Sequence, residues 1–258
     1  MVHHLGGPDW HCDAVDLATV SPAWWQSLPQ ARRNQVRFHS GLSIETLPFE
    51  PACFDLIVSQ YGLEYADLPR ALAEIRRVLA PHGQVALLMH HQGSRPVCLA
   101  RIELGHLADL LEPGGFMDTA LAMRPLLSQA VTAEGRAALN RDPAAIALRE
   151  RFNATLARLE ADSAQSACPD VLTDTLAAVM PMLKQSGAEP ERTDQGLREY
   201  QTALQDSQVR LQELCDVALD AAAAQWVCAQ LAPVCPGLVA TELHEGEYLM
   251  GWAIHANR

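Results

Sequence analysis

The amino-acid sequence predicts an α/β fold, in which a doubly wound, mostly parallel sheet ends in an antiparallel hairpin and carries a large helical insertion. Three observations lead to this prediction. The first part of the chain alternates short apolar runs with helical patterns, the long middle part is rich in Ala, Leu, Gln, Arg and Glu, and the last residues return to strand-like runs. The chain is 258 residues long, enough to build a large core.

Four short apolar runs are predicted to form the parallel strands, namely residues 13–17, 35–40, 54–59 and 84–90. Their apolar residues follow one another without alternation, which is typical of strands buried on both faces. The predicted core therefore takes most of its side chains from these strands. It comprises Val15, Leu17, Val36, Phe38, Leu56, Ile57, Val58, Ile75, Leu79, Val85, Leu87, Leu88 and Trp252.

A helix is predicted between the last two of these strands. Apolar residues recur at helical spacing from Leu68 to Leu79, and Pro81 and Gly83 then end the pattern. Strand, helix and strand in this order are typical of a right-handed crossover unit in a doubly wound sheet. Near the end of the chain, Gly246 marks a tight turn between two strand-like runs and predicts an antiparallel hairpin at about 239–256.

The middle of the chain predicts a helical insertion. Amphipathic stretches are separated by Pro and Gly at 113–115, 143, 169, 181 and 187–190, which favours internally packed helices over a coiled coil. The predicted domains are an α/β core at 1–93, a helical insertion or lid at 94–231, and a closing hairpin of the core at 232–258. The insertion could cap the active-site edge of the sheet, or form a dimerisation layer, or do both.

Composition limits the function classes. The formal net charge is −12 and Lys and Arg form no cluster, which argues against nucleic acid as a partner. No apolar run is long enough to span a membrane, and the first residues do not resemble a signal peptide, so we expect a soluble, cytoplasmic protein. The seven cysteines never occur as C-x-x-C, and we expect reduced, mostly buried thiols.

Four segments together resemble the class I S-adenosylmethionine-dependent methyltransferases, in particular their small-molecule branch. They are "VDLATVSP", "LPFEPACFDLIVSQYGLEYAD", "ALAEIRRVLAPHGQVALLMHH" and "GEYLMGWAIHA". The resemblance covers about residues 13–92 and the end of the chain, and leaves out the helical middle. It implies a Rossmann-like sheet and S-adenosylmethionine as cofactor, bound beyond the carboxyl ends of the strands.

The resemblance also implies cofactor-binding residues. Asp16 holds the place of the acidic residue that bonds the ribose hydroxyls; the alternative is a helix N-cap or a solvated loop residue. Gln60, Tyr61 and Gly62 match the loop that contacts the methionine end of the cofactor and faces the acceptor. Gly62 would let the backbone approach the ligand closely, whereas Tyr61 could simply pack in the core.

Two departures from the family pattern bear on the cofactor. Leu42 or Ser43 stands where the family usually has an Asp that bonds the adenine. The glycine-rich loop of the family has no counterpart ahead of Asp16. We therefore expect weak or absent S-adenosylmethionine binding if the chain is complete as given, and ordinary binding if the native chain is longer. The missing first strand would leave strand edges unpaired, so we also expect a homo-oligomer.

The candidate catalytic residues are His90, His91 and Tyr61. The two histidines end the fourth predicted strand at the same sheet edge as the loop 60–62, and a histidine can take a proton near neutral pH. Adjacent strand residues point to opposite faces, so at most one of the two is expected in the pocket, and both could be structural. No metal site is predicted, because His3, His4 and His11 would be loop-borne and lack carboxylate support.

The sequence thus predicts an S-adenosylmethionine-dependent methyltransferase that acts on an unidentified small molecule. The alternative is a catalytically inactive or repurposed methyltransferase-like protein, which binds a ligand or partner through its helical region. Membrane association is not expected in either case.

Overall fold

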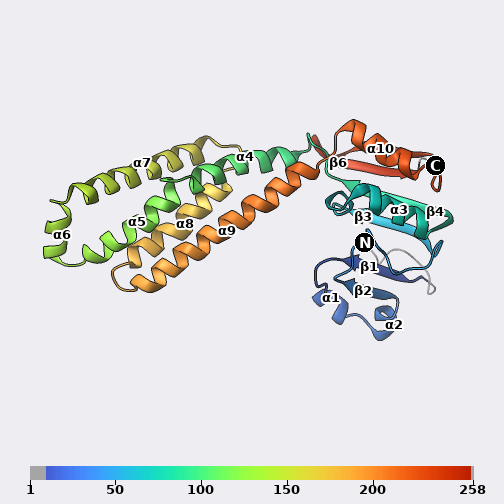
Figure 1. The fold of residues 1–258 in the computed structure, drawn as a ribbon, viewed down its shortest axis with the longest axis horizontal. Helices are drawn as coiled ribbons and strands as arrows, with labels where there is room; N and C mark the ends of the chain where they lie inside the picture. The colour runs from blue at the N-terminus through green and yellow to red at the C-terminus, as the bar shows by residue number, and fades with distance from the viewer. Residues whose placement is uncertain (1–9, 257–258) are drawn as a thin grey trace. The chain divides into compact units, whose positions relative to one another are not determined.

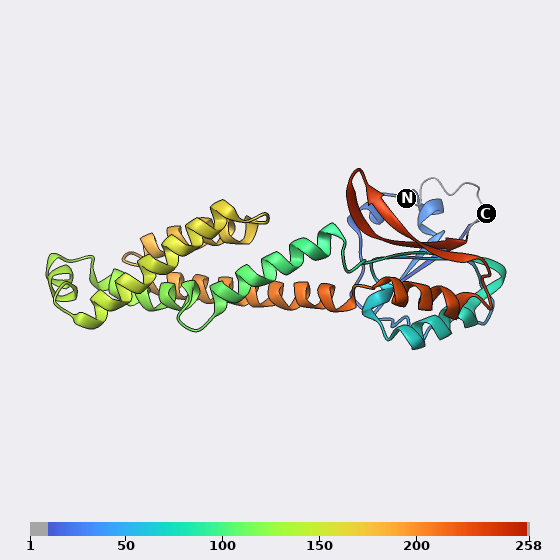
Figure 2. The ribbon, with the colours of Figure 1, turned by 90° about the horizontal axis from the view of Figure 1, so that it is seen from above.

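The computed structural model describes residues 10–256, which fall into two compact units. One unit combines the chain up to His91 with the chain from Leu219 onward, and we call it the α/β unit. The other comprises Gln92–Ala218 and is made of helices, and we call it the helical unit. Figure 1 and Figure 2 show the sheets and short helices of the first unit and the long helices of the second.

The α/β unit contains strands from both ends of the chain. Its elements are β1 (Cys12–Asp16), α1 (Ala23–Gln26), α2 (Gln30–Arg33), β2 (Val36–Ser40), β3 (Phe54–Gln60), η2 (Leu63–Tyr65), α3 (Leu68–Val78), β4 (Leu79–Met89), α10 (Ala221–Leu231), β5 (Leu238–Glu245) and β6 (Tyr248–Ala256). The predicted strand positions are confirmed to within a few residues. The largest difference is that β4 follows α3 directly and begins at Leu79, well before the predicted start at Gln84.

The strands form two sheets rather than the single one predicted. Strands β1 and β2 pair in parallel as a two-stranded sheet, and a four-stranded sheet has the order β3-β4-β6-β5. In the larger sheet, β3 and β4 are parallel, while β6 runs antiparallel to both β4 and β5. The parallel pairs and the C-terminal antiparallel hairpin are therefore as predicted, but a continuous Rossmann-like sheet is not formed by the described residues.

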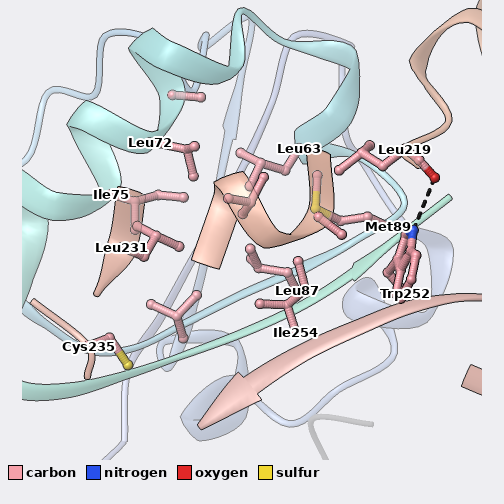
Figure 3. Packing of buried hydrophobic residues seen from close by; sticks show 14 of the residues in the cluster. Leu63, Leu72, Ile75, Leu87, Met89, Leu219, Leu231, Cys235, Trp252 and Ile254 are labelled. Carbon is pink, nitrogen blue, oxygen red and sulfur yellow. Dashed lines mark hydrogen bonds between the residues drawn. The ribbon is translucent and has the colours of Figure 1, made fainter. Parts of the chain in front are cut away.

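Helices α3 and α10 cover one face of the four-stranded sheet. Figure 3 shows Leu72 and Ile75 of α3 packed with Leu231 of α10 above Leu87 and Ile254 of the sheet. These five side chains are buried. The burial of Leu72 and Ile75 on one side of α3 accounts for the amphipathic pattern of this helix. The hydrophobic core of this unit thus lies between the two helices and the sheet.

Half of the predicted core is confirmed and part of it is wrong. The confirmed, buried residues are Val36, Ile75, Leu79, Val85, Leu87 and Trp252, and the half-buried ones are Val15, Phe38, Ile57 and Leu88. Leu17, Leu56 and Val58 are instead 73%, 42% and 60% exposed. Successive residues of a strand point to opposite faces, so Ile57 packs against the core while Leu56 and Val58 lie on the other face of β3, which stays exposed.

The helical unit consists of long helices with their own core. They are α4 (Arg95–Leu111), α5 (Phe116–Gln129), α6 (Ala133–Leu139), α7 (Pro143–Gln165), α8 (Asp170–Gln185) and α9 (Pro190–Val217). The predicted breaks near these ends are confirmed except the one at Pro181, which lies inside α8. Val179 and Leu183 on either side of Pro181 are buried, and their packing holds the helix through it.

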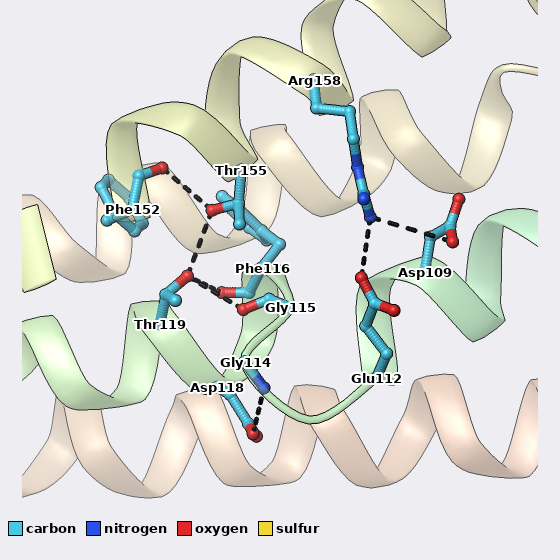
Figure 4. A network of polar contacts seen from close by, with 10 residues as sticks. All are labelled: Asp109, Glu112, Gly114, Gly115, Phe116, Asp118, Thr119, Phe152, Thr155 and Arg158. Carbon is cyan, nitrogen blue, oxygen red and sulfur yellow. Dashed lines mark hydrogen bonds and ion pairs between the residues drawn. The ribbon is translucent and has the colours of Figure 1, made fainter. Parts of the chain in front are cut away.

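Polar contacts tie neighbouring helices of this unit together. Figure 4 shows the guanidinium of Arg158 on α7 between the carboxylates of Asp109 and Glu112, and a contact between Thr119 and Thr155. The hydroxyl oxygens of the two threonines are 3.2 Å apart. The ion pairs are about half exposed, so they add little to stability by themselves. The main stabilisation comes from the apolar cluster beneath them.

One arginine fastens the loop before β3 to helix α3. Arg77 donates hydrogen bonds to the carbonyl oxygens of Leu47 and Phe49, at 2.8 and 2.7 Å, and pairs with Glu74 at 2.7 Å. Glu74 in turn accepts from the backbone N–H of Leu47. The hydrogen bond from Arg77 lowers the pKa of the Glu74 carboxyl, so this carboxylate is ionised at neutral pH.

We expect Arg77→Ala to lower the urea midpoint of unfolding clearly, because two loop carbonyls lose their donor and Glu74 loses its partner. Arg70→Ala is the matched control, since Arg70 pairs with Glu45 at a well-exposed position of the same helix and should change the midpoint little. Because the folded-state pKa of Glu74 is lowered, its stabilisation is present above the unfolded pKa and disappears as the pH falls through the folded one. Equal midpoints for both variants at neutral pH would contradict this assignment.

Candidate functional site

A cluster of aromatic and ionisable side chains lies where β3 and β4 end. It comprises Tyr61, Glu64, Tyr65 and His90, and we call it the Glu64–His90 cluster. One carboxylate oxygen of Glu64, Oε1, lies 2.9 Å from the backbone N of His90 and 2.7 Å from its ring Nδ1. The ring of Tyr61 lies over that of His90 at a centroid distance of 4.5 Å, and the ring of Tyr65 meets it edge-on at 6.1 Å.

The backbone between β3 and η2 positions these side chains. Tyr61 adopts a left-handed conformation with φ 51°, while its N–H still donates to the carbonyl of Leu88 in β4. The N–H of Leu63 donates to the hydroxyl of Ser59 and closes the turn. A bulky residue rarely has positive φ, and such local strain is most often found at functional sites.

Gly62 does not have the special backbone that the sequence suggested. Its φ is −144°, and an added Cβ would meet its neighbours only at ordinary distances of 3.7 Å or more. The close approach occurs instead at Gly251 of β6, where a Cβ would lie 2.6 Å from the carbonyl oxygen of Met89 and 3.1 Å from the ring of Tyr61. Gly251 therefore provides the space that Tyr61 occupies.

The carboxylate of Glu64 is fully buried, whereas the side chain of His90 keeps 12% of its surface exposed. The second oxygen of Glu64, Oε2, has no hydrogen-bond partner among the described residues. An unpaired buried polar atom costs about 1 to 3 kcal/mol, and each one in a folded protein requires an explanation. Burial, and then the charge of Glu64, raises the pKa of the Tyr61 hydroxyl, so Tyr61 stays protonated at neutral pH.

His91 lies in a different environment from His90. Its ring is 4.5 Å from that of Trp252, and its Nε2 is 3.9 Å from the carboxylate of Glu242. Trp252 is itself fixed by a hydrogen bond from its indole N–H to the carbonyl of Leu219. The two adjacent histidines thus contact separate sets of residues, as the alternation of strand side chains predicts.

The expected cofactor residues lie on two sheets. Asp16 is exposed at the end of β1, where its Oδ1 accepts from the N–H of Ala18 and its backbone carbonyl accepts from the N–H of Leu42. Gln60 is exposed at the end of β3, next to Tyr61. The structure brings Tyr61 and His90 into contact, and gives no contact between Asp16 and the Glu64–His90 cluster within residues 10–256.

Glu64 and Tyr65 were not predicted as site residues. A glutamate between a loop and a helix is usually solvated, and the sequence contains no periodicity over residues 63–65 that indicates burial. One signal in the sequence could have indicated Glu64. It is an acidic residue close to Tyr61, in the segment that follows the predicted strand next to the one ending at His90. Only the fold shows that the glutamate is turned inward.

Two further properties concern the described residues alone. No group of three or more His, Cys, Asp and Glu side chains is arranged to hold a metal ion between residues 10 and 256, and His3 and His4 lie outside this range. None of the helices in the same range is both long and apolar enough to cross a membrane.

The first part of the chain is similar to known proteins. Residues 4–87 match the family model of a methyltransferase domain. The chain is 47% identical over 47 residues to the 2-phytyl-1,4-naphtoquinone methyltransferase of Trichormus variabilis, covering 18% of this chain and 20% of that protein. It is 32% identical over 88 residues to the uncharacterized methyltransferase YcgJ of Bacillus subtilis, covering 34% of each.

The crystal structure of YcgJ from Bacillus subtilis matches with 29% sequence identity and a TM-score of 0.29, covering 38% of this chain and 43% of that one. This chain thus spans about a third or less of the length of the curated relatives it matches.

The family match includes the positions expected to bind the cofactor, Asp16 and 60–62, and also Glu64. His90 follows shortly after the end of the matched segment, on the strand that the segment enters. The resemblance in the strand and loop motifs is thereby confirmed. Through residues 4–87, this chain is similar to the methyltransferase-domain family.

Proposed function

We propose that this protein is an S-adenosylmethionine-dependent methyltransferase that acts on a small molecule. The observation that carries the proposal is the match of residues 4–87 to the methyltransferase-domain family. The name of one similar protein, a 2-phytyl-1,4-naphtoquinone methyltransferase, supports a small organic acceptor. The identity of that acceptor depends on residues outside the matched segment.

The residues that would hold the cofactor are Asp16, Gln60, Tyr61 and Gly62. The carboxylate of Asp16 fits this role, because it is exposed and, among residues 10–256, only its Oδ1 accepts a hydrogen bond, from the N–H of Ala18. The turn at Tyr61 and Gly62 lies directly beyond the end of β3, where ligands of open parallel sheets bind. When bound, the cofactor supplies a methyl group on a positively charged sulfur.

The catalytic residues that we propose are His90 and Tyr61. His90 would accept a proton from the acceptor, because its side chain is partly exposed while Glu64 holds it in place. Tyr61 would orient the ring of His90 and line the acceptor side of the loop. His91 is the weaker candidate, since its Nε2 lies 3.9 Å from the carboxylate of Glu242, too far for a hydrogen bond like the one between Glu64 and His90.

Calorimetric titration with S-adenosylhomocysteine tests cofactor binding. We expect Asp16→Ala to weaken binding about tenfold or more, because a hydrogen bond to a charged group contributes about 1.5 to 3 kcal/mol. Asp55→Ala is the matched control, since Asp55 is an exposed aspartate of β3 outside the Glu64–His90 cluster. No binding by the unaltered chain, or equal affinities for the protein and Asp16→Ala, would count against the proposed site.

A binding role for the helical unit is the second candidate function. A surface hollow of about 650 Å³ is lined by residues of α5 and α9, among them Arg124, Asp194 and Arg198. Asp194 pairs with both arginines, and the hydrogen bond from Arg198 lowers the pKa of its carboxyl. This hollow could receive a polar ligand or partner in the absence of methyl transfer. The second candidate gains support if the titration with S-adenosylhomocysteine gives no heat.

A further inference from the structure

We propose that Glu64 is a positioning residue, which holds His90 in the form that carries its ring proton on Nδ1 and leaves Nε2 as the base for a hydroxyl group of the methyl acceptor. The tautomer follows from the contacts of the α/β unit alone. The hydroxyl acceptor rests on the proposed function. Neither Glu64 nor the acceptor class was predicted from the sequence.

The tautomer of His90 follows from the two contacts of a single oxygen atom. A backbone N–H can only donate a hydrogen bond, so Oε1 of Glu64 accepts from the backbone N–H of His90 at 2.9 Å. The same oxygen lies 2.7 Å from Nδ1 of the ring. Because the oxygen of a carboxylate can only accept, Nδ1 is the donor, and in a neutral imidazole the other nitrogen, Nε2, keeps a lone pair.

The environment of His90 favours this arrangement over rotation of the ring. Tyr61 covers one side of the imidazole, Tyr65 meets it edge-on, and the N–H of Leu219 donates to the backbone carbonyl of His90 at 2.8 Å. Among residues 10–256, the titratable groups shown in contact with the ring are the two tyrosines and the carboxylate of Glu64. The ring is thus held from the backbone, from η2 and from the turn after β3.

Burial of the Glu64 carboxylate is unfavourable for folding, and we infer that its role lies in catalysis. Its Oε2 is buried without a donor from residues 10–256, which is unfavourable for the resting protein. When Nε2 takes a proton, the ring becomes an imidazolium whose positive charge lies next to this carboxylate. Because Oε1 lies 2.7 Å from Nδ1, the proton on Nδ1 stays hydrogen-bonded to Glu64 when Nε2 takes the second proton.

A base of this kind is required only by an acceptor that must lose a proton. The proton of a hydroxyl group moves to Nε2, the oxygen forms its new bond to the methyl carbon, and the electron pair of the broken carbon–sulfur bond stays on sulfur. An acceptor without a proton, such as a thioether or a tertiary amine, does not need the Glu64–His90 pair. The geometry therefore favours a hydroxyl acceptor of phenol or enol type, whose acidity is closest to that of a histidine.

The tautomer is tested without any ligand, by NMR of the protein labelled with ¹⁵N in its histidine rings. We expect His90, assigned by comparison with His90→Gln, to show a protonated Nδ1 and an unprotonated Nε2 when neutral. Glu64→Gln should keep this pattern, because its amide oxygen can still accept from the backbone N–H of His90. Glu64→Ala should shift the ring toward the Nε2–H form. Glu242→Gln, which removes the carboxylate near His91 and His244, is the matched control and should leave the His90 signals unchanged.

The acceptor class is tested with 4-nitrophenol, whose absorbance reports its ionisation, in the presence of saturating S-adenosylhomocysteine. At a pH where free nitrophenol is mostly protonated, the unaltered protein should raise the phenolate absorbance several-fold over His90→Gln. Glu64→Gln should give an intermediate value, because it keeps the tautomer and loses the charge.

An Nε2–H tautomer in the unaltered protein, or no change in Glu64→Ala, would overturn the role of Glu64. If Glu64→Ala does not fold, Glu64→Gln, which keeps the shape of the side chain and removes its charge, still tests the role of Glu64 through the nitrophenol absorbance. No phenolate increase with the unaltered protein would overturn the hydroxyl acceptor. Failure to bind S-adenosylhomocysteine would instead contradict the proposed methyltransferase function, while the tautomer measurement would remain valid.

Discussion

Leu87→Ala is expected to lower the free energy of unfolding of the α/β unit by about 2 to 5 kcal/mol. Leu87 is 1% exposed in the central strand β4, where it packs with Leu72 and Ile75 of α3 and with Ile254 of β6 (Figure 3). Truncation removes buried methyl groups and leaves a cavity. Because β4 is paired on both sides, it cannot shift to fill that cavity.

Tryptophan fluorescence during urea unfolding measures this loss in the right part of the molecule. All five tryptophans of the sequence, at positions 10, 24, 25, 226 and 252, belong to the α/β unit. Val58→Ala in the neighbouring strand β3 is the matched control, because Val58 is 60% exposed. It should cost less than about 1 kcal/mol. Similar losses for both variants would mean that the exposed face of β3 is covered in solution.

The contrast between Leu87 and Val58 also marks how far the sequence alone could predict the fold. Both residues lie in continuous apolar runs, and such runs locate strands well, because strand formation depends on short-range pattern. The run at β3 matches its observed bounds to within one residue, whereas β4 ends near its predicted end but begins at Leu79 rather than at Gln84. Burial on the second face of a strand depends on which elements pack there, and this information is not contained in the run itself.

The helical unit shows the same division between local and long-range information. Its breaks at 113–115 and 187–190 follow from the backbone properties of Pro and Gly, and were predicted. Pro181 has the same local signal, yet α8 continues through it because buried neighbours hold the helix. Tertiary packing can override a helix breaker when enough apolar surface is buried on both sides.

The candidate site was predicted in part. Tyr61 and His90 could be found, because residues at the carboxyl ends of neighbouring parallel strands meet at one edge of a sheet. The contact of His90 with Glu64 could not, because it requires that a residue of a short 3-10 turn faces inward. The left-handed backbone at Tyr61 could not be predicted either, because the sequence suggests unusual backbone geometry at the adjacent Gly62 instead.

Gly251→Ala is expected to lower the free energy of unfolding of the α/β unit by about 1 to 3 kcal/mol, as overpacking in a tight interior does. The added Cβ would lie 2.6 Å from the carbonyl oxygen of Met89, a backbone atom of the neighbouring strand that cannot rotate away. It would also lie 3.1 Å from the ring of Tyr61, which would have to move off His90. The substitution therefore couples strand packing to the geometry of the candidate site.

Two measurements on Gly251→Ala separate these effects. Urea unfolding followed by tryptophan fluorescence gives the loss of stability, and the ring signals of His90 in the NMR spectrum of the folded variant report the displacement of Tyr61. Gly62→Ala is the matched control, because its Cβ would meet only ordinary contacts, and it should change the free energy of unfolding by less than about 1 kcal/mol. A Gly251→Ala protein with unchanged stability and unchanged His90 signals would show that Tyr61 does not lie against β6 in solution. The aromatic cover that holds His90 in place for proton transfer would then have to come from Tyr65 alone.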